Sequence, residues 1–133
     1  MVLLLDTHIL LWVLDTPRRL PEDLRTTLAD PDHEVCFSAA SIWEIAVKAA
    51  LKRVNFRFRP DEIADAARQT GMVEVCVSAS QAARVVDLPH HHNDPFDRLL
   101  IAQALSLPAR LLTADAILLR YSELVQQVKV VSP

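Results

Sequence analysis

Short runs of apolar residues alternate with segments of helical periodicity along the whole chain. The apolar runs are typical of buried strands, because they do not alternate with polar residues and so leave neither face polar. They predict strands at 2–5, 34–38, 72–78, 109–113 and 127–132. Strands of this kind form mostly parallel sheets that helices cover on both faces. The pattern therefore predicts a three-layer α/β/α sandwich with a mostly parallel sheet.

Segments with apolar residues three or four positions apart predict the helices between these strands. The predicted helices cover residues 7–15, 21–30, 41–53, 60–71, 78–89, 95–107 and 114–124. Thr7 is a possible N-cap of the first helix, and Ser41 and Glu44 have the spacing of a capping box. Gly71, the only glycine, is expected to end the fourth. Without a repeat or a linker, 133 residues predict a single domain, residues 1–133.

Composition narrows the possible functions. A hydrophobic fraction of 51% is enough for a core. No apolar run reaches the roughly 18 residues of a membrane helix, and the start lacks the basic leader of a signal peptide, so we expect a cytoplasmic protein. A single glycine excludes a glycine-rich phosphate loop. Cys36 and Cys76 lie far apart in two apolar runs, which favours two buried thiols over a disulfide or a zinc site.

Carboxylates recur near the ends of the predicted strands. Asp6 ends the first strand, and Glu44 lies in the opening turns of the helix after the second. Asp94 and Asp97 open the helix before the fourth strand, and Asp115 follows that strand. Ligands of α/β sheets bind at the carboxyl ends of the strands, so we expect the acids to meet there. A divalent cation would relieve their repulsion, and an all-oxygen set suits Mg²⁺ or Mn²⁺, which could activate water.

Each of these acids also has a purely local explanation. Asp6 could be a turn residue at the end of a strand, and Glu44 could complete its capping box. Asp94 and Asp115 could be N-caps, and Asp97 could be a first-turn acid that meets the helix dipole. From the pattern alone, both interpretations stay open.

Other polar residues are weaker candidates. Ser38, Ser41 and Thr113 are expected to cap helices or to end strands, with a contact to an acid or a metal as the alternative. The three adjacent histidines 90–92 cannot all face one ion, so a solvated loop is favoured over a contact to substrate phosphate.

The segment from Lys48 to Arg59 carries five basic residues and no acid, with Phe56 and Phe58 interleaved. A solvated helix end and loop is the favoured interpretation. The alternative is a patch that follows a phosphate backbone, which would let a chain of net charge −3 hold RNA despite its lack of an overall basic field.

Four motifs follow one another along the chain: LLLDTHILLWVL, SAASIWEIAVKAAL, LPHHHNDPFDRLLIAQAL and LLTADAILLRY. In this order they resemble the motifs of PIN-domain ribonucleases of the VapC toxin type. The resemblance covers nearly the whole chain. It implies an α/β/α sandwich with a parallel sheet, metal-dependent endoribonuclease activity on RNA, a homodimer, and a cognate antitoxin that lies over a hydrophobic groove and can cover the acidic pocket.

Residue by residue, the resemblance implies that the family's acids fall on Asp6, Glu44, Asp97 and Asp115, as catalytic groups and ligands of Mg²⁺ or Mn²⁺. Asp94 matches an additional acid of the DPFDR subgroup and is a further candidate ligand. Supporting residues or substrate contacts are expected at Thr7, Ser38, His92, Arg98 and Thr113. Two departures concern turns rather than chemistry: Ser106 replaces a usual glycine, and the KRVNF segment lacks another.

Three other function classes are less favoured. A non-catalytic PIN-like binding module would not need the complete set of acids. A phospho-accepting signalling domain needs paired acids beside the first strand and a lysine after a late one, but only Asp6 stands there and LLTAD has no lysine. A purely structural partner subunit would not be stabilised by Mn²⁺.

Overall fold

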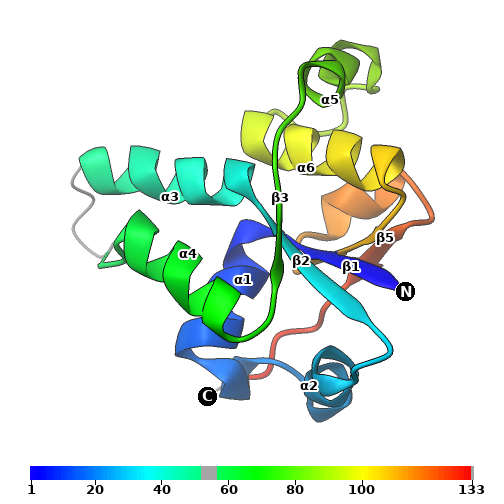
Figure 1. Ribbon diagram of the computed structural model, residues 1–133. Coiled ribbons are helices and arrows are strands. Elements are labelled where there is room, and N and C mark those ends of the chain that lie inside the picture. Colours follow the sequence, from blue (N-terminus) through cyan, green and yellow to red (C-terminus); the bar gives the residue numbers. More distant parts are fainter. Residues whose placement is uncertain (52–56, 133) are drawn as a thin grey trace.

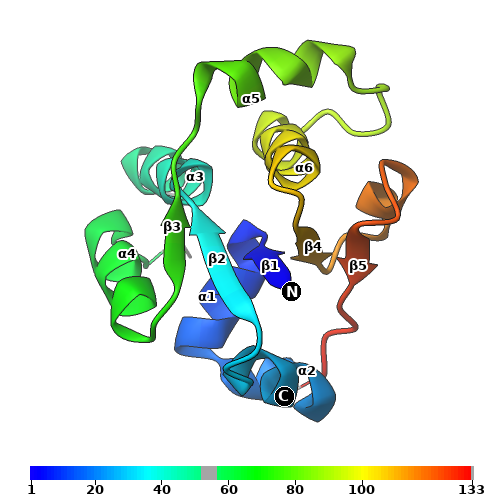
Figure 2. The same ribbon diagram turned by 45° about the vertical axis from the view of Figure 1, so that its right-hand side comes forward.

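Five parallel strands form a single sheet in the order β3-β2-β1-β4-β5. Figure 1 shows the fold in a computed structural model that describes residues 1–51 and 57–132. The strands are β1 Val2–Leu5, β2 Glu34–Ser38, β3 Val73–Val75, β4 Arg110–Thr113 and β5 Val125–Gln127. Figure 2 shows them side by side in this order, from β3 on the left to β5 on the right. The predicted α/β class with a parallel sheet is confirmed.

Six α-helices of the described residues connect the strands, together with three short 3₁₀ segments. The α-helices are α1 Thr7–Asp15, α2 Glu22–Ala29, α3 Ala39–Ala50, α4 Pro60–Gln69, α5 Ala79–Arg84 and α6 Pro95–Ser106. The 3₁₀ segments are η1 Pro17–Arg19, η2 Val85–Asp87 and η3 Ala116–Arg120. No helix of the described residues is long and apolar enough to cross a membrane.

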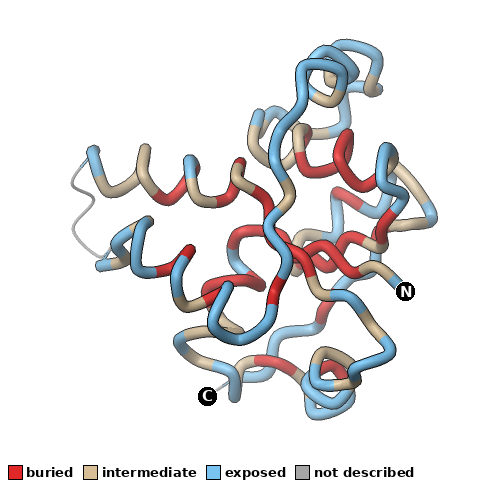
Figure 3. Tube along the Cα trace, viewed as in Figure 1, coloured by how far each residue is buried: buried red, intermediate tan, exposed pale blue. Residues whose placement is uncertain are grey.

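The central strand β1 divides its side chains between two hydrophobic cores, one on each face of the sheet. Leu3 and Leu5 belong to the first core, and Leu4 belongs to the second. Successive side chains of a strand point to opposite faces, so a strand buried on both sides must be apolar throughout. Figure 3 shows the resulting buried centre beneath exposed helix faces.

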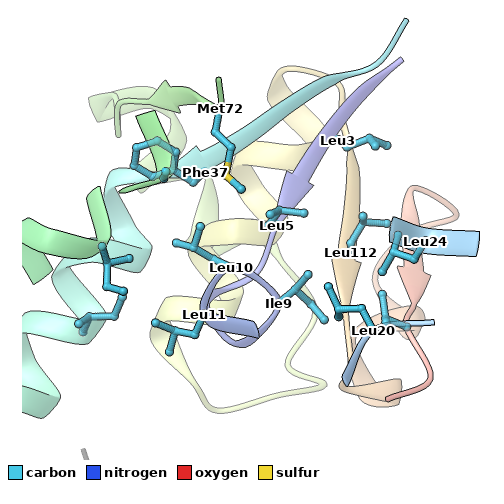
Figure 4. Packing of buried hydrophobic residues seen from close by; sticks show 14 of the residues in the cluster. Leu3, Leu5, Ile9, Leu10, Leu11, Leu20, Leu24, Phe37, Met72 and Leu112 are labelled. Atoms are coloured by element: carbon cyan, nitrogen blue, oxygen red, sulfur yellow. The ribbon is translucent and has the colours of Figure 1, made fainter. Parts of the chain in front are cut away.

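Helices from different parts of the chain complete the two cores. The first contains residues of α1, α2, α3 and α4, including Ile9, Leu10 and Leu24, which Figure 4 shows around β1. The second contains Leu100 and Ile101 of α6 together with residues of β4 and η3. These two cores establish the three-layer α/β/α arrangement.

α1 has its predicted bounds, but its predicted cap is wrong, and so is the predicted start of α3. Asp6, not Thr7, is the N-cap of α1, because its Oδ1 accepts the Ile9 N–H at 2.9 Å. Helix α3 begins two residues before the predicted start, with Ser38 as its N-cap. Ser41 and Glu44 therefore lie inside the helix and do not form a capping box. Their side chains are free for longer-range contacts.

Both edge strands differ from the prediction, because each pairs only where its neighbouring strand extends. β3 pairs only as far as Val75, opposite Ser38, where β2 ends and α3 begins. β5 lies at Val125–Gln127 and not at the predicted 127–132: it begins two residues earlier and ends at Gln127, opposite the last residue of β4. The predicted helix at 114–124 is reduced to the 3₁₀ segment η3. The expectation for Cys76 is also wrong: this residue follows β3 and is exposed, whereas Cys36 in β2 is buried.

The end of α4 offers a test of the backbone geometry. Gly71 has a φ of +94°, a conformation that disfavours residues with a Cβ. We predict that Gly71→Ala lowers the free energy of unfolding by about 1 kcal/mol, and that Gly71→Asn costs less because asparagine tolerates such conformations better. Urea denaturation measures both. Equal stability of the wild type and Gly71→Ala would contradict the geometry.

Candidate metal centre

The topology brings four chain segments together at the carboxyl edge of the sheet. From β1 the chain builds β2 and β3 on one side, and then crosses to build β4 and β5 on the other. The boundary between β1 and β4 is therefore the switch point at which ligands bind in open α/β sheets. Asp6 follows β1 there, and Asp115 lies two residues after β4. Helices α3 and α6 pack against each other and add Glu44 and Asp97.

A cleft of about 440 Å³ opens at this edge. Its lining contains all five acids that the sequence predicts, with two aromatic rings, one lysine and one histidine of the loop before α6. The lining residues are Asp6, His8, Trp12, Glu44, Lys48, His92, Asp94, Asp97, Ala114 and Asp115. The structure thus brings together acids that are up to 109 positions apart in sequence.

Asp6 is buried at the base of the cleft. Its carboxylate caps α1 through the Ile9 N–H. Burial raises the pKa of the Asp6 carboxyl above its ordinary value, and hydrogen bonds from the Thr113 side chain and the Ile9 N–H oppose that rise. Thr113 therefore contacts an acid, which is the alternative role that the sequence left open for it. A cap that stabilises α1 also holds this carboxylate at the end of β1.

Glu44 is held by two side chains, those of Thr7 and Lys48. The Thr7 hydroxyl lies 2.6 Å from Glu44 Oε1 and 3.0 Å from Ser41 Oγ. A hydroxyl has one proton to donate, so Thr7 donates to the carboxylate and accepts from Ser41. Lys48 Nζ lies 2.7 Å from Glu44 Oε2, one helical turn further along α3. The predicted supporting role of Thr7 thus consists of orienting Glu44.

Asp94 and Asp97 occupy the N-terminus of α6. Asp94 Oδ1 accepts the N–H groups of Phe96 and Asp97, at 2.8 and 3.3 Å, which makes it the N-cap. In the part of the chain that the structure describes, no hydrogen bond reaches the Asp97 carboxylate. Burial first, and then the charges of Asp94, Asp6 and Glu44, raise the pKa of Asp97 to about 7.

His92 is part of the cleft, whereas its two histidine neighbours are exposed. His92 Nε2 lies 2.9 Å from Asp115 Oδ2 and 3.6 Å from Asp97 Oδ2. The favoured expectation of a solvated loop is therefore wrong for His92. The sequence alone does not show which of the three histidines lines the cleft. That depends on Tyr121, whose hydroxyl accepts the N–H groups of His91 and His92.

Like Thr7 and Thr113, the predicted supporting residues Arg98 and Ser38 lie outside the lining of the cleft. The guanidinium of Arg98 is buried and donates to the carbonyl oxygens of Val85, Leu88 and Pro89 and to the Tyr121 hydroxyl. Arg98 thus holds the loop that carries His92, and its position does not favour a substrate contact. Ser38 is buried beside Gln103 and caps α3. It supports the helix that carries Glu44.

The basic segment is largely paired with acids. Lys48 binds Glu44, Arg57 Nη2 lies 2.6 Å from Asp15 Oδ2, and Arg59 Nε lies 3.3 Å from Asp61 Oδ1. These pairs favour a solvated, charge-balanced surface over a patch that follows phosphates. Lys52, Arg53 and Phe56 lie outside the described residues. Sequence analysis missed the Lys48 contact, although the four-residue spacing from Glu44 on one helix signals it.

The donor set fits a hard divalent cation. Asp97 is a half-buried carboxylate close to three other acids, and no hydrogen bond of the described residues reaches it, so a bound cation would stabilise its negative charge. Carboxylate oxygens are the ligands that Mg²⁺ and Mn²⁺ prefer. One side-chain donor atom each of Asp97, Asp115 and His92 lie within 4.8 Å of one another. Asp97 and Asp115 are therefore suited to share one ion.

Comparisons with known proteins agree with this architecture. The PIN domain family model matches residues 3–124. The fold is similar to a chain in the structure of VapBC2 from Rickettsia felis bound to a DNA fragment from their promoter, with a TM-score of 0.69, 14% identity, and coverage of 96% of this chain and 99% of that one. It is also similar to a chain of FitAcB from Neisseria gonorrhoeae, with a TM-score of 0.54, 17% identity, and coverage of 87% and 89%. No curated protein matches the sequence.

The raised pKa of Asp97 predicts a stability cost at neutral pH. The folded protein retains a proton on Asp97 up to about pH 7, whereas the unfolded chain, with the ordinary value of 3.8, loses it near pH 4. The contribution of this group to stability is thus complete below pH 4 and lost as the pH rises to 7. We predict that Asp97→Asn raises the Tm at pH 8 in EDTA, and that the difference narrows at pH 5.

Circular dichroism at both pH values measures this effect. Asp65→Asn serves as the control, because Asp65 is an exposed acid on α4 that pairs with Arg68. The control should gain nothing at pH 8. A Tm of Asp97→Asn at or below that of the wild type at pH 8 would refute the assignment of the raised pKa.

Proposed function

The chain belongs to the PIN domain family, and from this membership and the acidic cleft we propose that it is a metal-dependent endoribonuclease. The observation that carries the proposal is Asp97, a half-buried carboxylate whose pKa is raised to about 7 by burial and by three other acids, and which no hydrogen bond of the described residues satisfies. Such a group costs stability unless a cation binds it. A nuclease site explains why the cluster is built in this way.

Asp6, Asp97 and Asp115 are the proposed direct ligands, with Glu44 holding the ion directly or through water. Asp94 is an additional candidate, and its established contacts are those of the α6 cap. When bound, Mg²⁺ or Mn²⁺ supplies an activated water and stabilises charge on the phosphate. The choice of RNA over other phosphodiesters rests on the resemblance of the four sequence motifs.

The surrounding side chains prepare these carboxylates for ligation. Thr113 hydrogen-bonds to Asp6, and Thr7 and Lys48 hold the two oxygens of Glu44. Fixed carboxylates need no reorganisation when they meet the ion, which is how outer contacts raise metal affinity. No side chain is assigned as the sole general base.

Lys48 is also suited to meet the substrate. Its ammonium is half-buried at the wall of the cleft and is the only lysine or arginine among the described lining residues. A polyanion that enters a site with five acids needs local positive charge, which the bound ion and Lys48 would both provide. His8 and Trp12 line the same cleft, and Trp12 offers a surface on which a base could stack.

We further propose that the chain is the toxin of a type II toxin–antitoxin pair, that it binds a cognate antitoxin, and that it forms a homodimer. The four motifs of the VapC type and the PIN domain match support this assignment. The similar fold of a chain from VapBC2, a complex described with promoter DNA, is consistent with it.

Removing a proposed ligand should abolish cleavage without unfolding the protein. We predict that Asp6→Asn and Asp97→Asn each lower the rate of Mn²⁺-dependent cleavage of a mixed RNA substrate by about 100-fold or more, because each removes a charge that the ion requires. Asp65→Asn should cleave at the wild-type rate. Full activity in a purified Asp6→Asn/Asp97→Asn double variant would rule out the proposed site. The cleavage would then come from a contaminating nuclease or from another centre.

The toxin assignment predicts an effect in cells. Induced wild-type protein should slow growth and create new RNA 5′ ends, whereas Asp97→Asn should do neither at equal expression. Sequencing of RNA 5′ ends measures the difference. Identical growth and identical ends for both proteins would count against the toxin, even if the purified protein cleaves RNA.

A further inference from the structure

Both ring nitrogens of His92 are engaged in hydrogen bonds. Nδ1 lies 3.0 Å from the backbone nitrogen of Asp94, and Nε2 lies 2.9 Å from Asp115 Oδ2. The Asp94 amide can only donate, so Nδ1 accepts and carries no proton. A neutral imidazole has one proton, which is therefore on Nε2, where it is donated to the Asp115 carboxylate.

This arrangement conflicts with His92 as a metal ligand, although the spacing to Asp97 and Asp115 would allow an ion between all three. A histidine binds a metal through an unprotonated nitrogen. Nε2 could become unprotonated only if the proton moved to Nδ1, where it would face the Asp94 N–H. The Asp94 N–H would then lose its hydrogen-bond acceptor. Mg²⁺ and Mn²⁺ also prefer oxygen ligands.

We propose that His92 is a positioning residue that orients Asp115 through its Nε2–H and stays outside the coordination sphere of the metal. The proposal rests on the proposed metal-dependent function. Asp115 Oδ1 accepts the Ile117 N–H at 3.0 Å, so the two contacts together fix both carboxylate oxygens. The same Nε2 lies 3.6 Å from Asp97 Oδ2, beyond hydrogen-bond distance.

The loop of His92 is built to hold this ring in place. The His92 N–H donates to the Tyr121 hydroxyl at 2.9 Å, and Arg98 donates to the same hydroxyl at 3.2 Å. Arg98 also binds the carbonyl of Pro89, three residues before His92. The backbone that leads into His92 is thus anchored by contacts within the protein.

The first test reads the position of the proton directly. Long-range ¹H–¹⁵N correlation spectra of the histidine side chains, recorded on the metal-free wild type at pH 8 and again with Mg²⁺, distinguish the two neutral tautomers. We expect His92 to carry its proton on Nε2 in both samples. A proton on Nδ1 without metal, or a transfer to Nδ1 when Mg²⁺ is added, would overturn the proposal.

The second test separates the two hydrogen bonds of the ring. His92→Gln can place an amide N–H near the position of Nε2, and so keep a donor to Asp115. His92→Asn can keep an acceptor for the Asp94 N–H, but is too short to reach Asp115. We expect His92→Asn to weaken Mn²⁺ binding by about 10–100-fold, the usual effect of losing an outer contact, and His92→Gln to restore most of it. His90→Asn, in an exposed neighbour that binds Asn93, is the matched control and should bind as the wild type does.

Electron paramagnetic resonance of free Mn²⁺ measures the affinities, and RNA cleavage at rising Mn²⁺ supplies a second readout. Saturating Mn²⁺ should recover the activity of His92→Asn, which a merely misfolded variant would not show. Wild-type affinity in His92→Asn, or an equal loss in His92→Gln, would overturn the positioning role. A wild type that binds no Mn²⁺ would overturn the proposed function instead, and the metal-free spectrum distinguishes that failure from an incorrect proton position.

Discussion

Mutual repulsion between carboxylates at the carboxyl edge of the sheet is the constraint on which the rest of the site depends. Five acids line one cleft, and burial together with neighbouring negative charge raises the pKa of Asp97 to about 7. Much of the surrounding chemistry limits this repulsion: Lys48 neutralises Glu44, Thr113 hydrogen-bonds to Asp6, and His92 donates to Asp115. Among these acids, Asp97 is the one whose carboxylate receives no such hydrogen bond or cation from the described residues, which is why we propose that a metal ion binds there.

Local structure and chemistry use the same side chains here. Asp6, Asp94 and Asp115 are the N-caps of α1, α6 and η3. A capping carboxylate is held near the start of its helix. These helices start at the carboxyl edge of the parallel sheet, where the cleft lies. The explanation of the acids as caps and their explanation as a metal site are therefore not alternatives. Capping delivers the carboxylates to the cleft at no additional cost in conformational entropy.

The parts of the fold that the sequence predicts well are those governed by local pattern. β2 has its predicted bounds, because a continuous apolar run between polar residues allows little choice. The predicted β3 is too long and the predicted β5 is displaced towards the C-terminus, because the bounds of an edge strand are decided by the strand with which it pairs. At the site, the clustering of the acids can be predicted from the order of strands and motifs. The role of His92 cannot, because it depends on Tyr121, 29 positions later, and on a ring orientation set by the Asp94 amide.

The central claim is that Asp97 exchanges a proton for a divalent cation. Calorimetric titration of the metal-free protein with Mn²⁺ at pH 7, in two buffers of different ionisation enthalpy, counts the protons released on binding. With a pKa of about 7 for Asp97, the account predicts saturable binding with release of on the order of half a proton, and no such release in Asp97→Asn. Absence of binding, or binding with equal proton release in both proteins, would contradict it.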